Sequence, residues 1–170
     1  ELRGVCDALE FIERVTRRTW SKVDVGKHVA VIGAGNTAID AATEAVRLGA
    51  EQVSIIYRRG AEEMPAYNFE FDLAKRDGVV FHFLTAPKRI LGTGVVEALE
   101  CTKMKLGAAD EKGRRKPEPV PQSEFRIPVD MVIKAIGQKT GEALLVQIPD
   151  LKLEKGRVVV NPETMQTSNP

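Results

Sequence analysis

The stretch KHVAVIGAGNTAIDAATEAVRLG, residues 27–49, decides the fold of this chain. It begins with a short apolar run of the kind that forms a strand buried on both faces of a parallel sheet. The glycine-rich segment GAGNTA (33–38) follows, and after it comes a segment with helical periodicity that ends at Gly49. We therefore predict a strand, a tight turn and a helix, the opening unit of an α/β fold.

The alternation of strands and helices continues toward the C-terminus. QVSIIY (52–57) and VVFHFL (79–84) predict two further buried strands, and EMPAYNFEFDLAKRDG (63–78) predicts the helix between them. VDMVIKAIG (129–137) predicts another core strand. We expect an α/β fold with a Rossmann-like, doubly wound parallel sheet, helices on both faces and right-handed crossovers.

Three other segments have patterns of a different kind. Residues 4–18 have an apolar stripe at helical spacing and predict an N-terminal helix. Residues 88–106 predict two strands joined at GTG, which is an antiparallel β-excursion rather than a crossover helix. Residues 107–122 are rich in glycine, proline and charge and predict a surface loop, whose RRK cluster we interpret as a solvated loop tip rather than a binding patch.

The bulk composition excludes several classes of partner and compartment. The 170 residues include 25 basic and 24 acidic side chains, and this net charge of +1 gives no electrostatic reason to expect nucleic acid or an anionic membrane. No apolar run approaches the roughly 18–20 residues of a membrane span, and no signal peptide is evident. Cys6 and Cys101 form no CxxC pair; we expect two reduced thiols and a cytoplasmic protein, with a disulfide between them as the alternative.

The segment GAGNTA fits the pattern G-x-G-x-x-A in the context that a dinucleotide-binding turn requires. Gly33 permits the tight turn, Gly35 lets the backbone approach a pyrophosphate, and Ala38 lets the helix pack close to the sheet. The backbone N–H groups of Asn36 and Thr37 would bind the diphosphate together with the positive end of the helix dipole. The alternative is a tight glycine turn that binds nothing. The candidate residues are Gly33, Ala34, Gly35, Asn36, Thr37 and Ala38.

The second predicted strand ends in two arginines instead of an acid. An NAD site needs a carboxylate about 20 residues beyond the fingerprint to bind the ribose 2′-OH. Arg58 stands at that place, and no Asp or Glu lies between Gln52 and Ala61. Guanidinium groups bind a 2′-phosphate, so we interpret Arg58 and Arg59 as selectors of NADP(H) over NAD(H). The alternative is that they are surface arginines at the sheet edge.

The motifs GAGNTA, YRR, EEMPA and DMVIKAIGQ together resemble the NADPH-binding domain of the small (beta) subunit of glutamate synthase. They also resemble related flavoprotein modules of the two-dinucleotide-binding superfamily, including that of dihydropyrimidine dehydrogenase. The resemblance implies that Ala135, Ile136 and Gly137 lie near the nicotinamide side of the cofactor. An ordinary strand terminator is the alternative for Gly137. A direct cofactor contact of Glu63 stays open beside a role at the start of a helix.

The resemblance also implies how this chain takes part in a reaction. In such proteins the NADPH domain is inserted into an FAD domain, and the hydride passes from NADPH to FAD. No FAD fingerprint and no cysteine-rich iron–sulfur segment is present in this sequence, so we expect a fragment that is inactive without its FAD domain. The expected partners are that domain and a larger catalytic subunit. No catalytic acid or base is expected in this domain.

We therefore divide the chain into three parts. Residues 1–26 are an N-terminal helix and connector, residues 27–137 are the NADPH-binding domain, and residues 138–170 lead toward the FAD domain. Two other functions remain as hypotheses. One is a stand-alone module that binds or senses NADP(H) without turnover, and the other is a dehydrogenase with its own substrate site, for which no substrate domain remains.

Overall fold

The computed structural model describes residues 2–17, 23–110, 113, 115–137 and 142–169. The chain forms two compact units, Glu1–Ile136 and Gly137–Pro170. The elements of the first unit are β1 (Val5–Asp7), α1 (Ala8–Arg17), β2 (His28–Ile32), α2 (Asn36–Arg47), β3 (Gln52–Ile56), the 3₁₀-helix η2 (Ala61–Glu63), α3 (Asn68–Arg76), β4 (Val80–His82), β5 (Thr85–Leu91), β6 (Ala98–Ala109), β7 (Arg115–Pro128) and β8 (Met131–Lys134).

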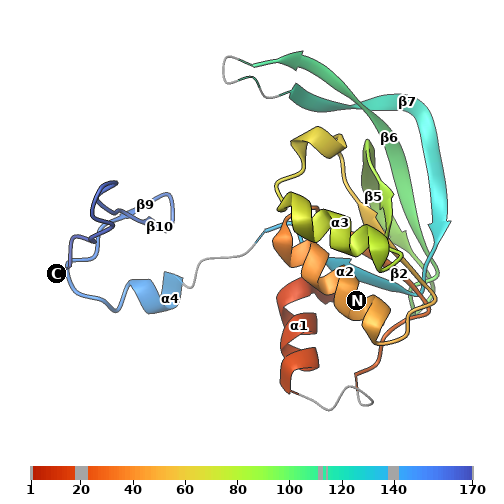
Figure 1. Cartoon of the computed structure of the whole chain (residues 1–170), viewed down its shortest axis with the longest axis horizontal. Helices are drawn as coiled ribbons and strands as arrows, with labels where there is room; N and C mark the ends of the chain where they lie inside the picture. The colour runs from red at the N-terminus through yellow and green to blue at the C-terminus, as the bar shows by residue number, and fades with distance from the viewer. Residues whose placement is uncertain (1, 18–22, 111–112, 114, 138–141, 170) are drawn as a thin grey trace. The chain divides into compact units, whose positions relative to one another are not determined.

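A five-stranded parallel sheet with the order β1-β8-β2-β3-β4 forms the centre of this unit (Figure 1). The predicted strands over 27–33, 52–57 and 79–84 are confirmed as β2, β3 and β4. Ile32 pairs with Ile56 on one side and with Lys134 on the other, so β2, β3 and β8 end level with one another. The carboxyl ends of these three strands therefore meet at one edge of the sheet.

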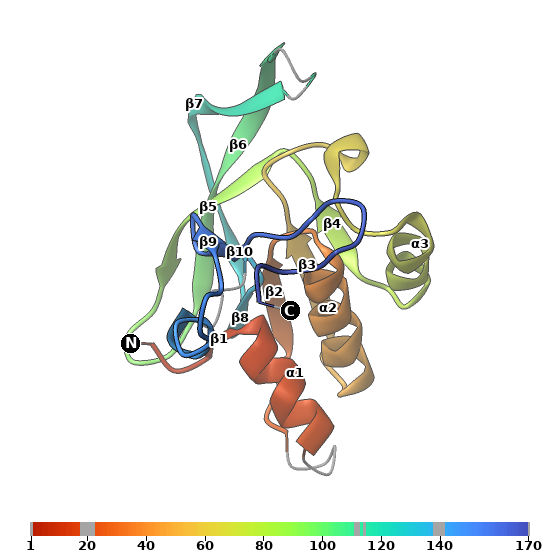
Figure 2. The same cartoon turned by 90° about the vertical axis from the view of Figure 1, so that its left-hand side faces the viewer.

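Helices α1, α2 and α3 cover one face of the parallel sheet (Figures 1 and 2). Helix α2 packs through Ala38, Ala41, Ala42 and Ala45, each of which is fully buried. Such small side chains let the helix axis approach the sheet closely, and they pack against Val31 and the other apolar residues on this face. The helix predicted over residues 36–49 is confirmed.

The antiparallel sheet β5-β6-β7 confirms the predicted antiparallel β-excursion, and it covers the opposite face of the parallel sheet. Leu99 and Cys101 of β6 pack there against Ala30 and Ile32 of β2. The prediction of helices on both faces is therefore wrong for the described residues, because the connection from β4 to β8 consists of three strands instead of a helix.

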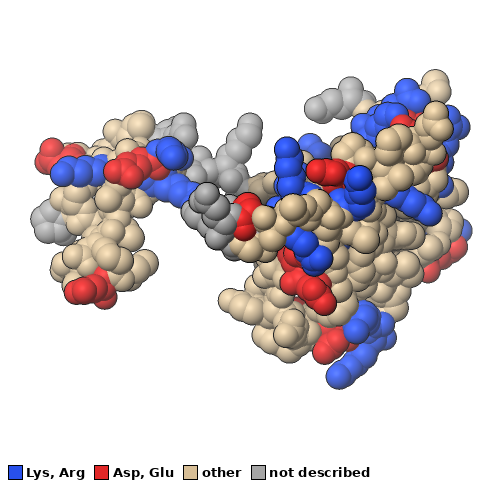
Figure 3. All heavy atoms as spheres, turned by 90° about the horizontal axis from the view of Figure 1, so that it is seen from above, with Lys and Arg blue, Asp and Glu red and all other residues tan. Residues whose placement is uncertain are grey.

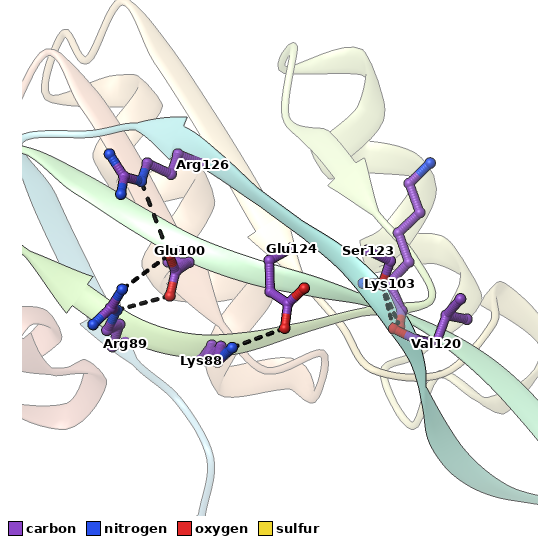
Figure 4. Close-up of polar contacts among 8 residues, drawn as sticks. All are labelled: Lys88, Arg89, Glu100, Lys103, Val120, Ser123, Glu124 and Arg126. Carbon is purple, nitrogen blue, oxygen red and sulfur yellow. Dashed lines mark hydrogen bonds and ion pairs between the residues drawn. The ribbon is translucent and has the colours of Figure 1, made fainter.

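The prediction of a surface loop over residues 107–122 is also wrong, because β7 begins at Arg115 and pairs with β6. Pro117 and Pro119 lie opposite Leu106 and Met104. Since β7 is the edge strand of its sheet, one side of its backbone has no strand partner, and a proline without an N–H group is tolerated there. A register shift follows between Thr102 and Met104, where the Ser123 hydroxyl accepts a hydrogen bond from the Lys103 N–H (3.1 Å; Figure 4).

Two predicted helices begin later than expected. Residues 5–7 form β1, which pairs with β8, so the N-terminal helix starts at Ala8 and belongs to the same unit as the sheet. Helix α3 starts at Asn68 instead of residue 63. Met64 precedes a proline, which disfavours the α-conformation, and its backbone is extended (φ −71°, ψ 125°).

Both cysteines are buried free thiols, as expected. Cys6 belongs to the core on the helical side of the sheet, and Cys101 belongs to the core on the other side. Burial raises the pKa of both thiols, that of Cys101 to about 11. The parallel sheet therefore separates two unreactive thiols.

The second unit contains α4 (Glu142–Leu145) and a short antiparallel pair, β9 (Leu153–Glu154) and β10 (Arg157–Val158). None of the residues whose burial is described in this unit is fully buried. Within the described parts of both units, no helix has the length and apolar character that crossing a bilayer requires.

A network of ion pairs lies on the outer face of the antiparallel sheet (Figure 4). Glu100 of β6 accepts hydrogen bonds from Arg89 of β5 at 2.7 and 3.3 Å, and its carboxylate lies 3.9 Å from Arg126 of β7. Lys88 and Glu124 form a second pair between β5 and β7 at 2.8 Å. The side chain of Glu100 is only 10% exposed, and the hydrogen bond from Arg89 lowers its pKa. This carboxylate joins the three strands while it is ionised.

We predict that Glu100→Gln destabilises the protein at neutral pH and has little effect in acid. Because the folded-state pKa of Glu100 lies below the ordinary value of 4.5, its stabilising contribution is fully present above that pH. The contribution is lost as the pH falls through the lowered pKa. Thermal unfolding followed by circular dichroism should show a gap between wild type and E100Q that closes with acidification. Glu118→Gln, in the exposed part of β7, is the matched control, and a gap independent of pH would contradict the prediction.

Candidate functional site

The three segments that follow β2, β3 and β8 lie together at the carboxyl edge of the parallel sheet. The Gly33 N–H donates to the carbonyl of Ile56 at 3.1 Å, and the Ala135 N–H donates to the carbonyl of Ile32 at 2.8 Å. The predicted pyrophosphate turn is thereby joined to the ends of both neighbouring strands. Edges of this kind are where open parallel sheets bind their ligands.

At Gly33 the backbone of the turn lies very close to the backbone of Ala135. Its φ is +129°, a conformation that side chains rarely adopt, and a Cβ at this position would lie 2.3 Å from the carbonyl oxygen of Ala135. Both facts require glycine here, so the motif's first glycine has a structural reason independent of any ligand.

Gly35 differs from Gly33 in both respects. Its φ of −84° is ordinary, and a Cβ built on it would meet no atom within 4 Å. The space in front of this residue is open, and Gly35 is the N-cap of α2 without a side-chain cap. Ala34 and Ala38 on either side of it are buried. The turn therefore presents backbone and the positive end of a helix dipole to an open space.

Asn36 and Thr37 form the start of α2, as the motif predicts, and both are half-buried. The Asn36 side chain has a role that the sequence did not suggest. Its carbonyl oxygen accepts a hydrogen bond at 3.1 Å from the N–H of Tyr67. This bond joins the extended segment before α3 to the turn.

The two arginines follow β3 in a bend that backbone hydrogen bonds of neighbouring residues hold in place. The Tyr57 N–H donates to His82 (3.0 Å), and the Leu84 N–H donates to the Arg59 carbonyl (2.9 Å). Arg58 is exposed, whereas Arg59 is half-buried. The Nε atom of Arg59 is buried and has no hydrogen-bond partner in the described part of the chain. Buried side-chain donors normally have an acceptor, so this nitrogen is a candidate contact for a bound acceptor group.

Glu63 closes the turn after the arginines. Its Oε2 atom accepts a hydrogen bond from the Gly60 N–H at 3.0 Å, and its own N–H donates to the Gly60 carbonyl at 3.3 Å, so Glu63 caps the start of η2. Its backbone carbonyl accepts the Tyr57 hydroxyl at 2.6 Å, and burial raises the pKa of that hydroxyl, so it stays protonated as a donor. The other carboxylate oxygen binds Arg115 of β7. Of the two roles left open for Glu63, these bonds support the structural one.

The third predicted segment divides between the two units. Ala135 is half-buried against the turn, and Ile136 beside it is 73% exposed. Gly137 is the first residue of the second unit. Ala135 is thus the member of this predicted set that contacts the glycine turn.

Sequence analysis missed Arg115 as part of this region. Glu63 stands three residues after Gly60, and an acid at this spacing is a local signal for the cap at the start of η2. No local signal identifies Arg115, which is 52 residues away from Glu63 in the sequence. On the face drawn in Figure 3, Lys and Arg side chains lie beside Asp and Glu side chains. Since the whole chain carries a net charge of only +1, the positive charge at the two arginines is a local feature.

Comparison with known proteins gives one family and several relatives. Residues 2–170 match the family described as pyridine nucleotide-disulphide oxidoreductase. Subunit beta of the NADP(+)-dependent formate dehydrogenase of Moorella thermoacetica is 44% identical over 149 residues, which are 85% of this chain and 20% of that protein. The glutamate synthase [NADPH] small chain of Azospirillum brasilense is 37% identical over 145 residues, or 84% of this chain and 30% of that protein. This chain thus spans less than a third of either relative.

Solved structures show the same fold. FprA of Mycobacterium tuberculosis in complex with NADPH has a TM-score of 0.70 at 18% identity, covering 100% of this chain and 51% of that one. Thioredoxin reductase of T. acidophilum has a TM-score of 0.66 at 20% identity, covering 99% and 47%. The predicted dinucleotide-binding fold is therefore confirmed.

We predict opposite outcomes for alanine at the first two glycines of the turn. Gly33→Ala should destabilise the protein by about 1–3 kcal/mol from backbone strain alone, with the contact to Ala135 in addition. Gly35→Ala, the matched control, should change stability by less than about 1 kcal/mol, since its φ is ordinary and its surroundings are open. Urea unfolding of both variants measures the difference. Equal stability of the two would show that the close approach at Gly33 is not needed.

Proposed function

We propose that this chain binds NADPH at the carboxyl edge of its parallel sheet. The chain belongs to the pyridine nucleotide-disulphide oxidoreductase family, which supports a nicotinamide cofactor. In this proposal it orients the nicotinamide for hydride transfer to an FAD that lies outside this chain. The identity to the glutamate synthase small chain agrees with the resemblance found in the motifs.

The turn fits the pyrophosphate of such a cofactor. Gly35 leaves open space where a Cβ would stand, so two phosphate groups can approach the backbone closely. Helix α2 directs its positive N-terminal end into the same space, and anions bind favourably there. We assign the pyrophosphate to residues 33–38 and the nicotinamide side to Ala135 and Ile136, which follow β8.

The observation that carries the proposal is the buried Nε of Arg59, which lacks a hydrogen-bond partner in the part of the chain that the structure describes. A 2′-phosphate would supply the missing acceptor, and Arg58, exposed beside it, would add a second guanidinium or lie over the adenine. An NAD ribose has a hydroxyl at this place and would leave the donor without a charged acceptor. The arrangement therefore favours NADPH over NADH.

In this proposal NADPH supplies a hydride, and this chain's own residues bind and orient the cofactor. Those residues place the cofactor by its pyrophosphate and its 2′-phosphate, so that the nicotinamide lies beyond the end of β8. No proton transfer by a side chain of this domain is required. The names "small chain" and "subunit beta" of the relatives support a place in a larger assembly with an FAD domain and a larger catalytic subunit.

We predict that the wild-type chain binds NADPH more tightly than NADH and that Arg59→Ala removes most of the difference. Loss of a charge-assisted hydrogen bond costs about 1.5–3 kcal/mol, so NADPH affinity should fall by about tenfold to a hundredfold. Affinity for NADH should change by less than about threefold. Isothermal titration calorimetry at fixed low salt measures all four constants.

The matched control is Arg76→Ala, which removes an exposed arginine in the last turn of α3, near the opposite edge of the sheet. Arg58→Ala should show a smaller loss than Arg59→Ala, because Arg58 is the more exposed of the two. Equal binding of both cofactors by the wild type would show that the arginines do not select NADPH over NADH.

A separate prediction concerns Gly35→Ala. Its methyl group would enter the space assigned to the pyrophosphate, which both cofactors share, so affinity for NADPH and for NADH should fall by the same factor. The same titrations measure it. A loss confined to one cofactor would contradict the assignment of the pyrophosphate to this turn.

A further inference from the structure

We propose that Arg115, at the start of β7, is a positioning residue that makes the arginine pair selective for a 2′-phosphate. It does so by neutralising two carboxylates that follow the pair in the sequence. The inference rests on the proposed binding of NADPH and concerns a residue outside the cofactor motifs.

The chain places two acids next to its proposed phosphate site. Glu62 and Glu63 come three and four residues after Arg59. Carboxylates so close to a phosphate site repel the phosphate and compete with it for guanidinium groups. The site therefore needs a means of keeping these two charges away from the arginines.

Arg115 supplies that means through both of its ion pairs. Its Nε and one terminal nitrogen donate to Oε1 of Glu63, at 3.0 and 2.5 Å, and the same terminal nitrogen lies 3.7 Å from Glu62. The remaining Glu63 oxygen accepts the Gly60 N–H. Both oxygens of Glu63 thus have hydrogen-bond partners, Gly60 in the turn and Arg115 in β7, and neither partner belongs to the arginine pair.

This pair differs from an ordinary surface salt bridge. The Glu63 side chain is only 16% exposed and the Arg115 side chain 43%, so solvent screens their interaction less than it screens fully exposed charges. The contact also joins distant parts of the chain, since the hairpin of β6 and β7 extends beside η2 in two perpendicular views (Figures 1 and 2). Arg115 stands at the last paired position of that hairpin, opposite Ala109.

Loss of Arg115 would change the local balance of charge. The two arginines, the two glutamates and Arg115 together carry a net charge of +1, which falls to zero without Arg115. Glu63 would then lose its main partner and could approach Arg58 or Arg59 in place of the phosphate. NADH, which has no 2′-phosphate, would be affected little. The expected consequence is a loss of selectivity with little loss of general dinucleotide binding.

The test is calorimetric titration of the full chain with NADPH and NADH. Arg115→Gln should lower NADPH affinity by about tenfold and leave NADH affinity within about twofold. The triple variant R115Q/E62Q/E63Q should restore most of the NADPH affinity, because glutamine at position 63 still offers an acceptor to Gly60 without a charge. Lys116→Gln is the matched control, since it removes an exposed cation from the neighbouring position of β7.

The outcomes separate this inference from the proposed function. A wild type that prefers NADPH together with an R115Q variant of unchanged selectivity overturns the inference alone. Equal losses for both cofactors, or a triple variant without restored NADPH affinity, also overturn it. A wild type without preference overturns both proposals. If circular dichroism shows that R115Q does not fold, Arg115→Lys replaces it. Lysine keeps the positive charge, so the inference requires this variant to retain the NADPH preference. A lost preference overturns the inference.

Discussion

The contact between Gly33 and the backbone of Ala135 is the constraint on which the candidate site depends. Only a residue without Cβ can stand there, because a side-chain atom would lie 2.3 Å from a carbonyl oxygen. The contact lets the turn after β2 lie against the end of β8, while the Gly33 N–H binds the end of β3. One glycine thus brings together the turn, the segment with the arginines and the end of β8, which lie far apart in the sequence.

The antiparallel sheet has two roles in this arrangement. Its inner face replaces the helices that cover the second face of other doubly wound sheets, and Leu99 and Cys101 supply part of that core. Its hairpin also extends far enough to bring Arg115 to Glu63. On its outer face, Glu100 of β6 joins Arg89 of β5 and Arg126 of β7. The antiparallel sheet therefore both covers one face of the parallel sheet and supplies Arg115 to the proposed site.

The proposed selectivity follows from where charges are satisfied and where they are not. Glu63 is bonded on both oxygens, whereas the buried Nε of Arg59 has no hydrogen-bond partner among the described residues. A folded protein leaves a buried cationic donor in this state rarely, because its desolvation is not compensated. A doubly charged phosphate compensates it well. In this view the cofactor preference depends on the internal bonding of one acid, Glu63, beside the buried donor of Arg59.

The sequence by itself determined the elements whose signals are local. The apolar run, the glycine turn and the helix over residues 27–49 are confirmed because strand, turn and helix periodicity act over a few neighbouring residues. Tertiary structure alone decided that residues 115–128 form a strand, that residues 5–7 join the sheet, and that strands cover its second face. It also decided the pairing of Arg115 with Glu63. Each of these depends on contacts between residues far apart in the chain, and such contacts leave no periodic pattern in the sequence.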